Sequence, residues 1–147
     1  MRNFVKNKLK EEKGLTLIEL LAVIVILGII AAIAIPAIGN IIENSRYNAV
    51  KGDALNVLSA AQIYYSETKT DTEGDVSVDK LKTDGYLETA GKIPDTATVS
   101  KASPRKLTAK DVKYSGDKTI TFNGATTDDI NKDDQKGSAP SINAIGG

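Results

Sequence analysis

The N-terminal part of the sequence changes abruptly from a charged segment to an apolar one that carries a single acid. Residues 1–14 contain five basic residues, and residues 15–35 are apolar except for Thr16 and Glu19. Because an α-helix rises about 1.5 Å per residue, the apolar run spans roughly 30 Å, the thickness of a bilayer core. The positive flank predicts that residues 1–14 stay in the cytoplasm and that the chain from residue 43 onward lies outside.

Glu19 is unusual in such a segment, because a carboxylate near the centre of a bilayer costs on the order of 2–3 kcal/mol. Its side chain can reach the headgroups by snorkelling, in which case the helix is a plain single-pass anchor. In the alternative, Glu19 binds a cation on a partner molecule. Cleavage after Gly14 would give Leu15 a new α-amine, and a neighbouring copy shifted along the helix axis would place that amine beside Glu19. Such a pair would fix the stagger of one subunit on the next.

The composition excludes several classes of site. The chain of 147 residues has no Cys and no His, which excludes disulfides, thiol catalysis, Cys/His zinc sites and histidine acid–base chemistry. The sequence offers no nucleophile–base pair and no phosphate-binding loop, so we expect neither an enzyme nor a cofactor. Without residues 1–14 the chain keeps 14 basic and 17 acidic residues, a net charge of −3, which does not favour bulk binding of nucleic acid.

The segment KGLTLIELLAVIVILGIIAAIAIP resembles the class III leader and N-terminal helix of type IV pilins and pseudopilins. A signal peptide would be cut after its apolar stretch, whereas Gly14 precedes the stretch here. The resemblance implies that a prepilin peptidase cuts between Gly14 and Leu15 and that Leu15 is then N-methylated. Glu19 matches the family's fifth-position glutamate, Thr16 the threonine beside the N-terminus, and Pro36 the helix-kinking proline. Phenylalanine is the commonest first mature residue in the family, and leucine is tolerated.

A long helix is expected over residues 15–67, with residues 15–36 in the membrane or the filament core. Pro36 kinks or locally opens a helix, and Gly28 and Gly39 weaken it on either side. The family resemblance implies that this region unwinds when subunits pack, while a static kink is the alternative. Beyond Asn44, apolar residues recur at spacings of three and four, which predicts a stripe that packs against a head domain. This stripe consists of Tyr47, Val50, Ala54, Val57, Leu58, Ala61, Tyr64 and Tyr65.

Residues 68–147 are expected to form a small, β-rich head. Ser77 is a candidate cap for a short helix over Val78–Asp84, which Gly85 would end. Thr96–Lys101 is a candidate strand, and two more strands are predicted by the alternation around Val112, Tyr114, Ile120 and Phe122. The fold class is therefore α+β: a pilin-like long N-terminal α-helix packed against a small antiparallel β-sheet.

The turn at Gly116-Asp117 is expected to be a loop of three or five residues, because only an odd number keeps the four apolar strand residues on one face. The last segment, KGSAPSINAIGG, predicts a flexible C-terminal tail that is disordered or lightly docked.

Two acidic segments have the alternate oxygen spacing of a calcium loop. Asp129, Asn131 and Asp133 form one of them, but Asp134 stands where such a loop needs glycine, and no bidentate glutamate follows. The other segment is equally incomplete and consists of Asp71, Glu73 and Asp75. We therefore expect solvated loops rather than metal sites.

The resemblance implies a structural subunit that is cleaved, methylated and polymerised into a type IV pilus for adhesion, twitching motility or DNA uptake. Its partners would be further copies, the prepilin peptidase, an inner-membrane assembly platform and minor pilins. It would lie in the cytoplasmic membrane with its N-terminus inside, and on the cell surface after assembly. Residues 78–88 resemble an element of Gram-positive pilins, which suggests that type. The alternatives are a pseudopilin of a type II secretion or competence system and a single-pass membrane-anchored binding protein.

Overall fold

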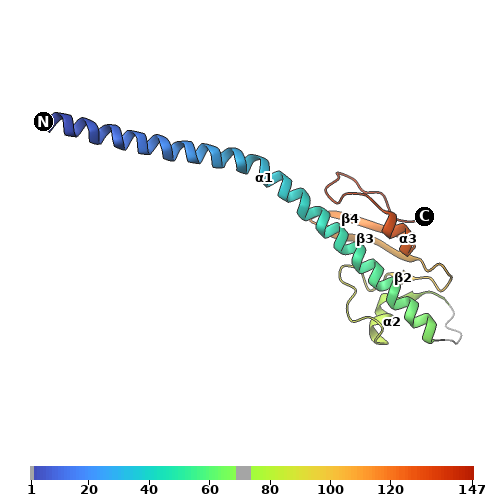
Figure 1. Cartoon of the computed structure of the whole chain (residues 1–147). Coiled ribbons are helices and arrows are strands. Elements are labelled where there is room, and N and C mark those ends of the chain that lie inside the picture. Colours follow the sequence, from blue (N-terminus) through green and yellow to red (C-terminus); the bar gives the residue numbers. More distant parts are fainter. Residues whose placement is uncertain (1, 69–73) are drawn as a thin grey trace. The chain divides into compact units, whose positions relative to one another are not determined.

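The computed structural model describes residues 2–68 and 74–147 (Figure 1). Its elements are, in chain order, α1 (Arg2–Glu67), β1 (Val76–Ser77), α2 (Val78–Thr83), β2 (Thr98–Val99), β3 (Leu107–Ser115), β4 (Lys118–Ala125) and α3 (Thr127–Lys132). The chain divides into two units, Met1–Gly39 and Asn40–Gly147. The first unit holds only the N-terminal part of α1, and the second holds the rest of α1 with all other elements.

In the first unit, α1 begins at Arg2 rather than at the predicted residue 15. The reason is that residues 2–13 are mostly good helix formers, and Gly14 alone costs a helix only about 1 kcal/mol. Every large apolar side chain from Leu15 to Ile38 is exposed. By length and composition α1 can cross a membrane, and its most apolar stretch has no buried residue.

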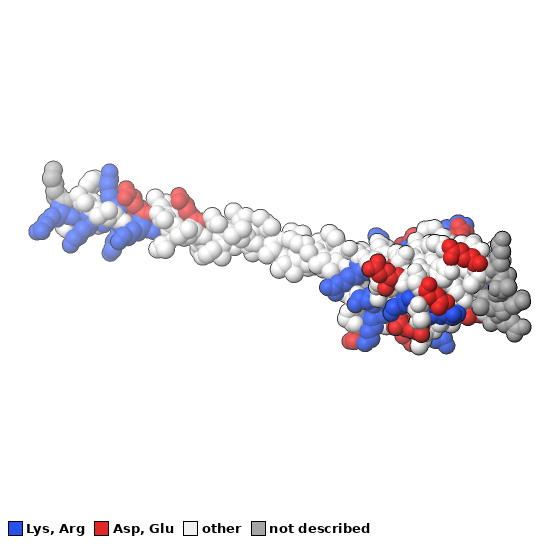
Figure 2. Space-filling model, turned by 90° about the horizontal axis from the view of Figure 1, so that it is seen from below, with Lys and Arg blue, Asp and Glu red and all other residues white. Residues whose placement is uncertain are grey.

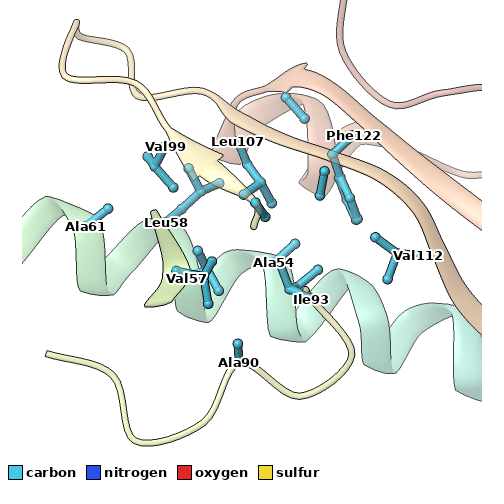
Figure 3. Close-up of a cluster of buried hydrophobic side chains, with 14 of the residues drawn as sticks. Ala54, Val57, Leu58, Ala61, Ala90, Ile93, Val99, Leu107, Val112 and Phe122 are labelled. Carbon is cyan, nitrogen blue, oxygen red and sulfur yellow. The ribbon is translucent and has the colours of Figure 1, made fainter. Parts of the chain in front are cut away.

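In the second unit, the apolar stripe of α1 is buried as the sequence predicts. The buried side chains are Tyr47, Val50, Ala54, Val57, Leu58, Ala60, Ala61 and Tyr64, while Tyr65 is partly buried. They face a cluster from the sheet and the loops, which includes Ile93, Val99, Leu107, Val112 and Phe122 (Figure 3). Helix α1 ends at Glu67, the residue at which the sequence predicts its end.

The head contains one antiparallel sheet in the order β1-β2-β3-β4, which confirms the predicted α+β fold class. Strands β2, β3 and β4 lie over the C-terminal part of α1 (Figure 1). Strand β2 falls inside the predicted strand Thr96–Lys101, and Thr98 pairs with Thr108 of β3. Strand β1 was not predicted, because two residues are too few to show an alternation.

The β3–β4 hairpin differs from the predicted one. Ser115 pairs with Lys118, so the connection is a two-residue loop, and the predicted odd-length loop is wrong. The next pair is Lys113 with Thr119, which leaves Tyr114 as the extra residue of a β-bulge. The bulge supplies the odd residue within the strand instead of the loop. It shifts the side-chain alternation by one, so the four apolar strand residues are still buried together.

The predicted caps of α2 are confirmed. The Ser77 hydroxyl accepts a hydrogen bond from the Lys80 backbone N–H at 3.2 Å. Gly85 follows the helix with a φ of +81°. The Tyr86 N–H returns to the Leu81 carbonyl at 2.9 Å, which closes the helix end.

The C-terminal segment is docked on β4 rather than free. Ile145 is buried and forms an isolated parallel bridge with Phe122. The Asn123 N–H donates to the Ile145 carbonyl, and the Ile145 N–H donates to the Thr121 carbonyl, both at 2.9 Å. Of the two expected states of the tail, the docked one is found; the few apolar residues of this segment show no strand or helix periodicity, so the sequence did not predict which residue makes the contact.

Gly91 lies in the loop between α2 and β2 with a φ of +58°, beside Asp53 of α1. The Lys92 backbone N–H donates to Asp53 Oδ2 at 2.9 Å, and a Cβ atom on Gly91 would overlap that carboxylate. We expect Gly91→Ala to lower the free energy of unfolding by about 2–4 kcal/mol, through left-handed strain and the lost hydrogen bond. Chemical denaturation of the purified chain measures this loss.

Gly85→Ala is the matched control, because Gly85 also has a positive φ but open space around it. It should cost only the backbone strain, about 1–2 kcal/mol. Equal losses in the two variants would show that the contact with Asp53 contributes nothing.

Candidate assembly site

The predicted cleavage junction lies within α1. A Cβ atom added to Gly14 would meet nothing within 4 Å. The Thr16 hydroxyl donates to the backbone carbonyl of Glu12 at 2.9 Å, which is a hydrogen bond within the helix. No contact within the described residues 2–68 and 74–147 therefore requires glycine at position 14, so a requirement for glycine there would come from another molecule.

Glu19 stands at the edge of an apolar surface that the chain does not cover. It is four residues from Leu15, so both side chains lie on one face of α1. Within residues 2–68 and 74–147, no salt bridge joins Glu19 to a basic side chain. Figure 2 shows in white the stretch of residues 20–42, which contains no charged residue. The arrangement leaves both the carboxylate and the apolar face available to a partner.

Gly28, Pro36 and Gly39 all lie within α1. A Cβ atom on either glycine would meet nothing within 4 Å, so neither is required by packing inside the chain. The boundary between the two units falls directly after Gly39. All three residues thus belong to the first unit, of which Gly39 is the last residue.

Two of the calcium candidates, Asp129 and Asp133, make other contacts. Asp129 belongs to the capping box of α3, where its Oδ2 accepts from the Thr126 N–H at 2.9 Å and from the Thr126 hydroxyl at 2.8 Å. These bonds hold the pKa of Asp129 below its usual value. In the part of the chain that the structure describes, no group of three acidic side chains is placed to hold a metal ion. Asp71 and Glu73 lie outside the described residues.

Asp133, the third candidate, is the C-cap residue of α3 and the centre of a largely buried polar cluster that includes two residues of α1. Its side chain is 7% exposed, and Oδ2 lies 3.0 Å from the ammonium of Lys51. The same oxygen accepts from the Tyr47 hydroxyl at 2.7 Å, and Oδ1 accepts from the Gln135 amide at 2.7 Å. Lys51 also donates to the Asp133 backbone carbonyl at 2.7 Å. We refer to these four residues as the Asp133 cluster.

The cluster fixes the charge states of its members. Burial alone would raise the pKa of Asp133, but the hydrogen bonds from Gln135, Tyr47 and Lys51 and the charge of Lys51 lower it below its usual value. Burial and the hydrogen bond to Asp133 raise the pKa of the Tyr47 hydroxyl. Asp133 is therefore ionised, and Tyr47 stays protonated as its donor. The sequence analysis treated Asp133 as a solvated residue, and the available signal was that Tyr47 and Lys51 stand one turn apart on α1.

Comparison with known proteins relates the chain to a family through its N-terminal segment and through several relatives. A model described as the prokaryotic N-terminal methylation motif matches residues 9–35. Fimbrial protein EcpC of Eikenella corrodens is 30% identical over 123 residues, which cover 80% of this chain and 77% of that protein. Fimbrial protein Q of Moraxella bovis is 39% identical over 80 residues, which cover 54% of this chain and 51% of that protein.

A third relative is the type II secretion system core protein G of Pseudomonas aeruginosa, which is 30% identical over 98 residues, covering 58% of this chain and 67% of that protein. The chain thus spans about half the length of fimbrial protein Q and larger shares of the other two. These relatives, from Eikenella, Moraxella and Pseudomonas, do not support the Gram-positive type suggested by residues 78–88. No solved structure matches the chain. With an N-terminal methylation motif, two fimbrial relatives matched over about three quarters of their length and an α+β fold led by a long helix, the chain belongs to the type IV pilin family.

Proposed function

We propose that the chain is a prepilin that is cut between Gly14 and Leu15, N-methylated on Leu15 and polymerised through residues 15–36 into a type IV pilus. The observation that carries this proposal is the exposed apolar helix that lies within the methylation motif matched over residues 9–35. Polymerisation would move the apolar face from lipid into contact with the helices of neighbouring copies, and close packing between those helices would supply the attraction. The proposed outputs are adhesion, twitching motility or DNA uptake.

Glu19 has a specific role in this mechanism. After cleavage, the α-amine of Leu15 is a cation in an apolar environment, and the carboxylate of Glu19 is an anion in the same environment. Neither is tolerated alone, but a pair between neighbouring copies satisfies both. The pair forms at only one axial stagger of neighbouring copies, so Glu19 selects the register of the filament. The apolar face supplies the attraction.

The positively charged leader sets the proposed topology. Residues 1–14 stay in the cytoplasm, residues 15–36 cross the membrane, and the head lies outside until the subunit is assembled. The prepilin peptidase, an inner-membrane assembly platform and minor pilins are the proposed partners. Pro36, Gly28 and Gly39 would allow α1 to extend locally when subunits pack.

A pseudopilin is the second candidate, and the similarity to a type II secretion system core protein supports it. A pseudopilin would share the cleavage, the methylation and the use of Glu19, but it would build a short internal fibre. A membrane-anchored binding protein that never polymerises would share none of these three properties.

Mass spectrometry of material sheared from the surface of cells that make the protein tests the proposal. We expect an abundant polypeptide that begins at Leu15 and carries a methyl group on its α-amine. The same modified polypeptide found only in the membrane would favour the pseudopilin. A chain that retains residues 1–14 in the membrane would leave only the anchored binding protein.

Gly14→Val is expected to block removal of the leader without unfolding the chain, because a Cβ atom at this position meets nothing within 4 Å. The expected result is a membrane protein that keeps residues 1–14 and yields no fibres. Gly28→Val is the control, because it also places valine at an uncrowded glycine of α1, and it should still be cut. Normal cutting of the Gly14→Val chain would show that the peptidase does not read this residue.

A further inference from the structure

Lys118, the first residue of β4, places its ammonium group among four oxygen atoms. Glu43 Oε2 lies 2.8 Å from Nζ and forms a salt bridge with it. The backbone carbonyls of three consecutive residues, Gly137, Ser138 and Ala139, each lie 3.3 Å from Nζ. An ammonium has only three protons, so it cannot donate a separate hydrogen bond to each of four oxygens. The four oxygens therefore surround it as they would surround a cation.

The oxygens are held in place by contacts that do not involve Lys118. The Tyr114 hydroxyl donates to the Gly137 carbonyl at 2.9 Å. The Ser138 N–H donates to Asn44 Oδ1 of α1 at 2.9 Å, and the Ala139 N–H donates to the Lys136 carbonyl at 2.9 Å. Residues 136–139 therefore form a turn fixed to α1, with its carbonyls directed at a point that Glu43 also reaches.

This donor set is the one that hard metal ions use. Calcium takes carboxylate and backbone carbonyl oxygens and completes its shell with water. We propose that the turn of residues 137–139 and Glu43 form a cation site, which the ammonium of Lys118 occupies as a tethered cation in place of a metal ion. The cation holds the C-terminal turn against α1, in a chain that has no disulfide to do so. The site takes a free oxygen-seeking cation such as Ca²⁺ when the lysine is shortened. This inference is independent of the proposed assembly function.

The test uses the full chain in detergent micelles, with thermal unfolding followed by circular dichroism at constant ionic strength set by tetramethylammonium chloride. Lys118→Ser empties the site and should lower the melting temperature. Added Ca²⁺ should then raise it by about 4–8 °C at roughly ten times the dissociation constant. The wild-type chain, whose site is filled, should respond to Ca²⁺ much less.

Three variants separate the site from general effects. Lys118→Met loses the charge but fills the space, so its melting temperature should fall and Ca²⁺ should not restore it. Lys118→Ser combined with Glu43→Gln should lose the calcium response, because the only carboxylate of the site is gone. Lys113→Ser removes an exposed lysine of β3 and should change neither stability nor response.

Three results would overturn the proposal: an unchanged melting temperature for Lys118→Ser, the same calcium response in the Met and Ser variants, or a response that survives Glu43→Gln. If Lys118→Ser does not fold without metal, refolding in the presence of Ca²⁺ but not in its absence supports the proposal, and failure in both contradicts it.

Discussion

Cells that make the Glu19→Ala chain are expected to carry no fibres, although the protein is still cut after Gly14 and still lies in the membrane. The substitution adds no charge to the apolar helix and does not alter its length, so insertion is unaffected. It removes the only acid of residues 15–42 and leaves the α-amine of a neighbouring Leu15 without a counter-ion. Breaking such a pair costs about 3–5 kcal/mol per contact, which weakens each subunit addition by a factor of roughly 10²–10⁴.

Fibre yield is measured by shearing and immunoblotting, membrane content by fractionation, and leader removal by mass spectrometry. Glu12→Ala is the matched control, because it removes an acid from the same helix, but one that leaves with the leader. It should yield fibres in normal amount. Normal fibres from the Glu19→Ala chain would refute the ion-pair mechanism, whereas a chain that is no longer cut would attribute the loss to the peptidase instead.

The elements that the sequence predicts correctly are those with a regular pattern. The stripe of α1 repeats at spacings of three and four, and its members from Tyr47 to Tyr64 are buried as expected. The cap of α2 is equally local, because Ser77 and Gly85 act within one turn of the helix. The N-terminal motif is read directly from residue types, and it is matched by a family model over residues 9–35.

The features that the sequence did not reveal depend on contacts between distant parts of the chain. The bulge at Tyr114 cannot be distinguished from an odd-length loop by alternation, because both shift the register by one residue. The docking of Ile145 on Phe122 joins residues with no shared pattern. Lys118 reaches carbonyls of residues 137–139, and backbone acceptors have no signature in side-chain identity.

For the charged residues of the head, too, the sequence does not reveal contacts between distant parts of the chain. Asp128 and Asp133 are both aspartates near α3, and each forms a salt bridge with a lysine. The pair of Asp128 with Lys132 is 70% and 75% exposed, whereas Lys51 in the other pair is 15% exposed. Sequence spacing identifies the first pair, four residues apart on one helix. Only the fold shows that the second is buried, and the two should therefore differ greatly in their contribution to stability.

Asp133→Ala is expected to lower the free energy of unfolding by about 2–3 kcal/mol, because it removes the counter-ion of the largely buried Lys51 and the acceptor of the Tyr47 hydroxyl, while Lys51 keeps its hydrogen bond to the backbone carbonyl of residue 133. Asp128→Ala, the matched control, removes the exposed pair and should change stability by at most about 0.5 kcal/mol. Denaturant unfolding of the full chain in detergent measures both. Losses of similar size would show that the buried pair is worth no more than a surface pair.

The pH dependence of stability tests whether the charge of Asp133 is the cause of its contribution. The folded pKa of Asp133 is lowered, so its contribution is fully present above the unfolded value of about 3.9 and is lost as the pH falls through the folded pKa. Above about pH 4 the wild-type chain should have a larger free energy of unfolding than Asp133→Asn, and this difference should shrink as the pH is lowered further. A constant gap across this range would assign the stabilisation to shape and neutral hydrogen bonds.

A double-mutant cycle with Lys51→Met and Asp133→Asn measures the interaction between these two residues. Each single substitution leaves a polar group in the core without its partner, but the double substitution removes both charges together and keeps the long side chain that packs beside the Tyr47 ring. We expect the double variant to lose at least about 1 kcal/mol less than the sum of the two single losses. An additive result would mean that Lys51 and Asp133 act independently, so the buried contact would not hold residues 133–135 against α1 as a pair.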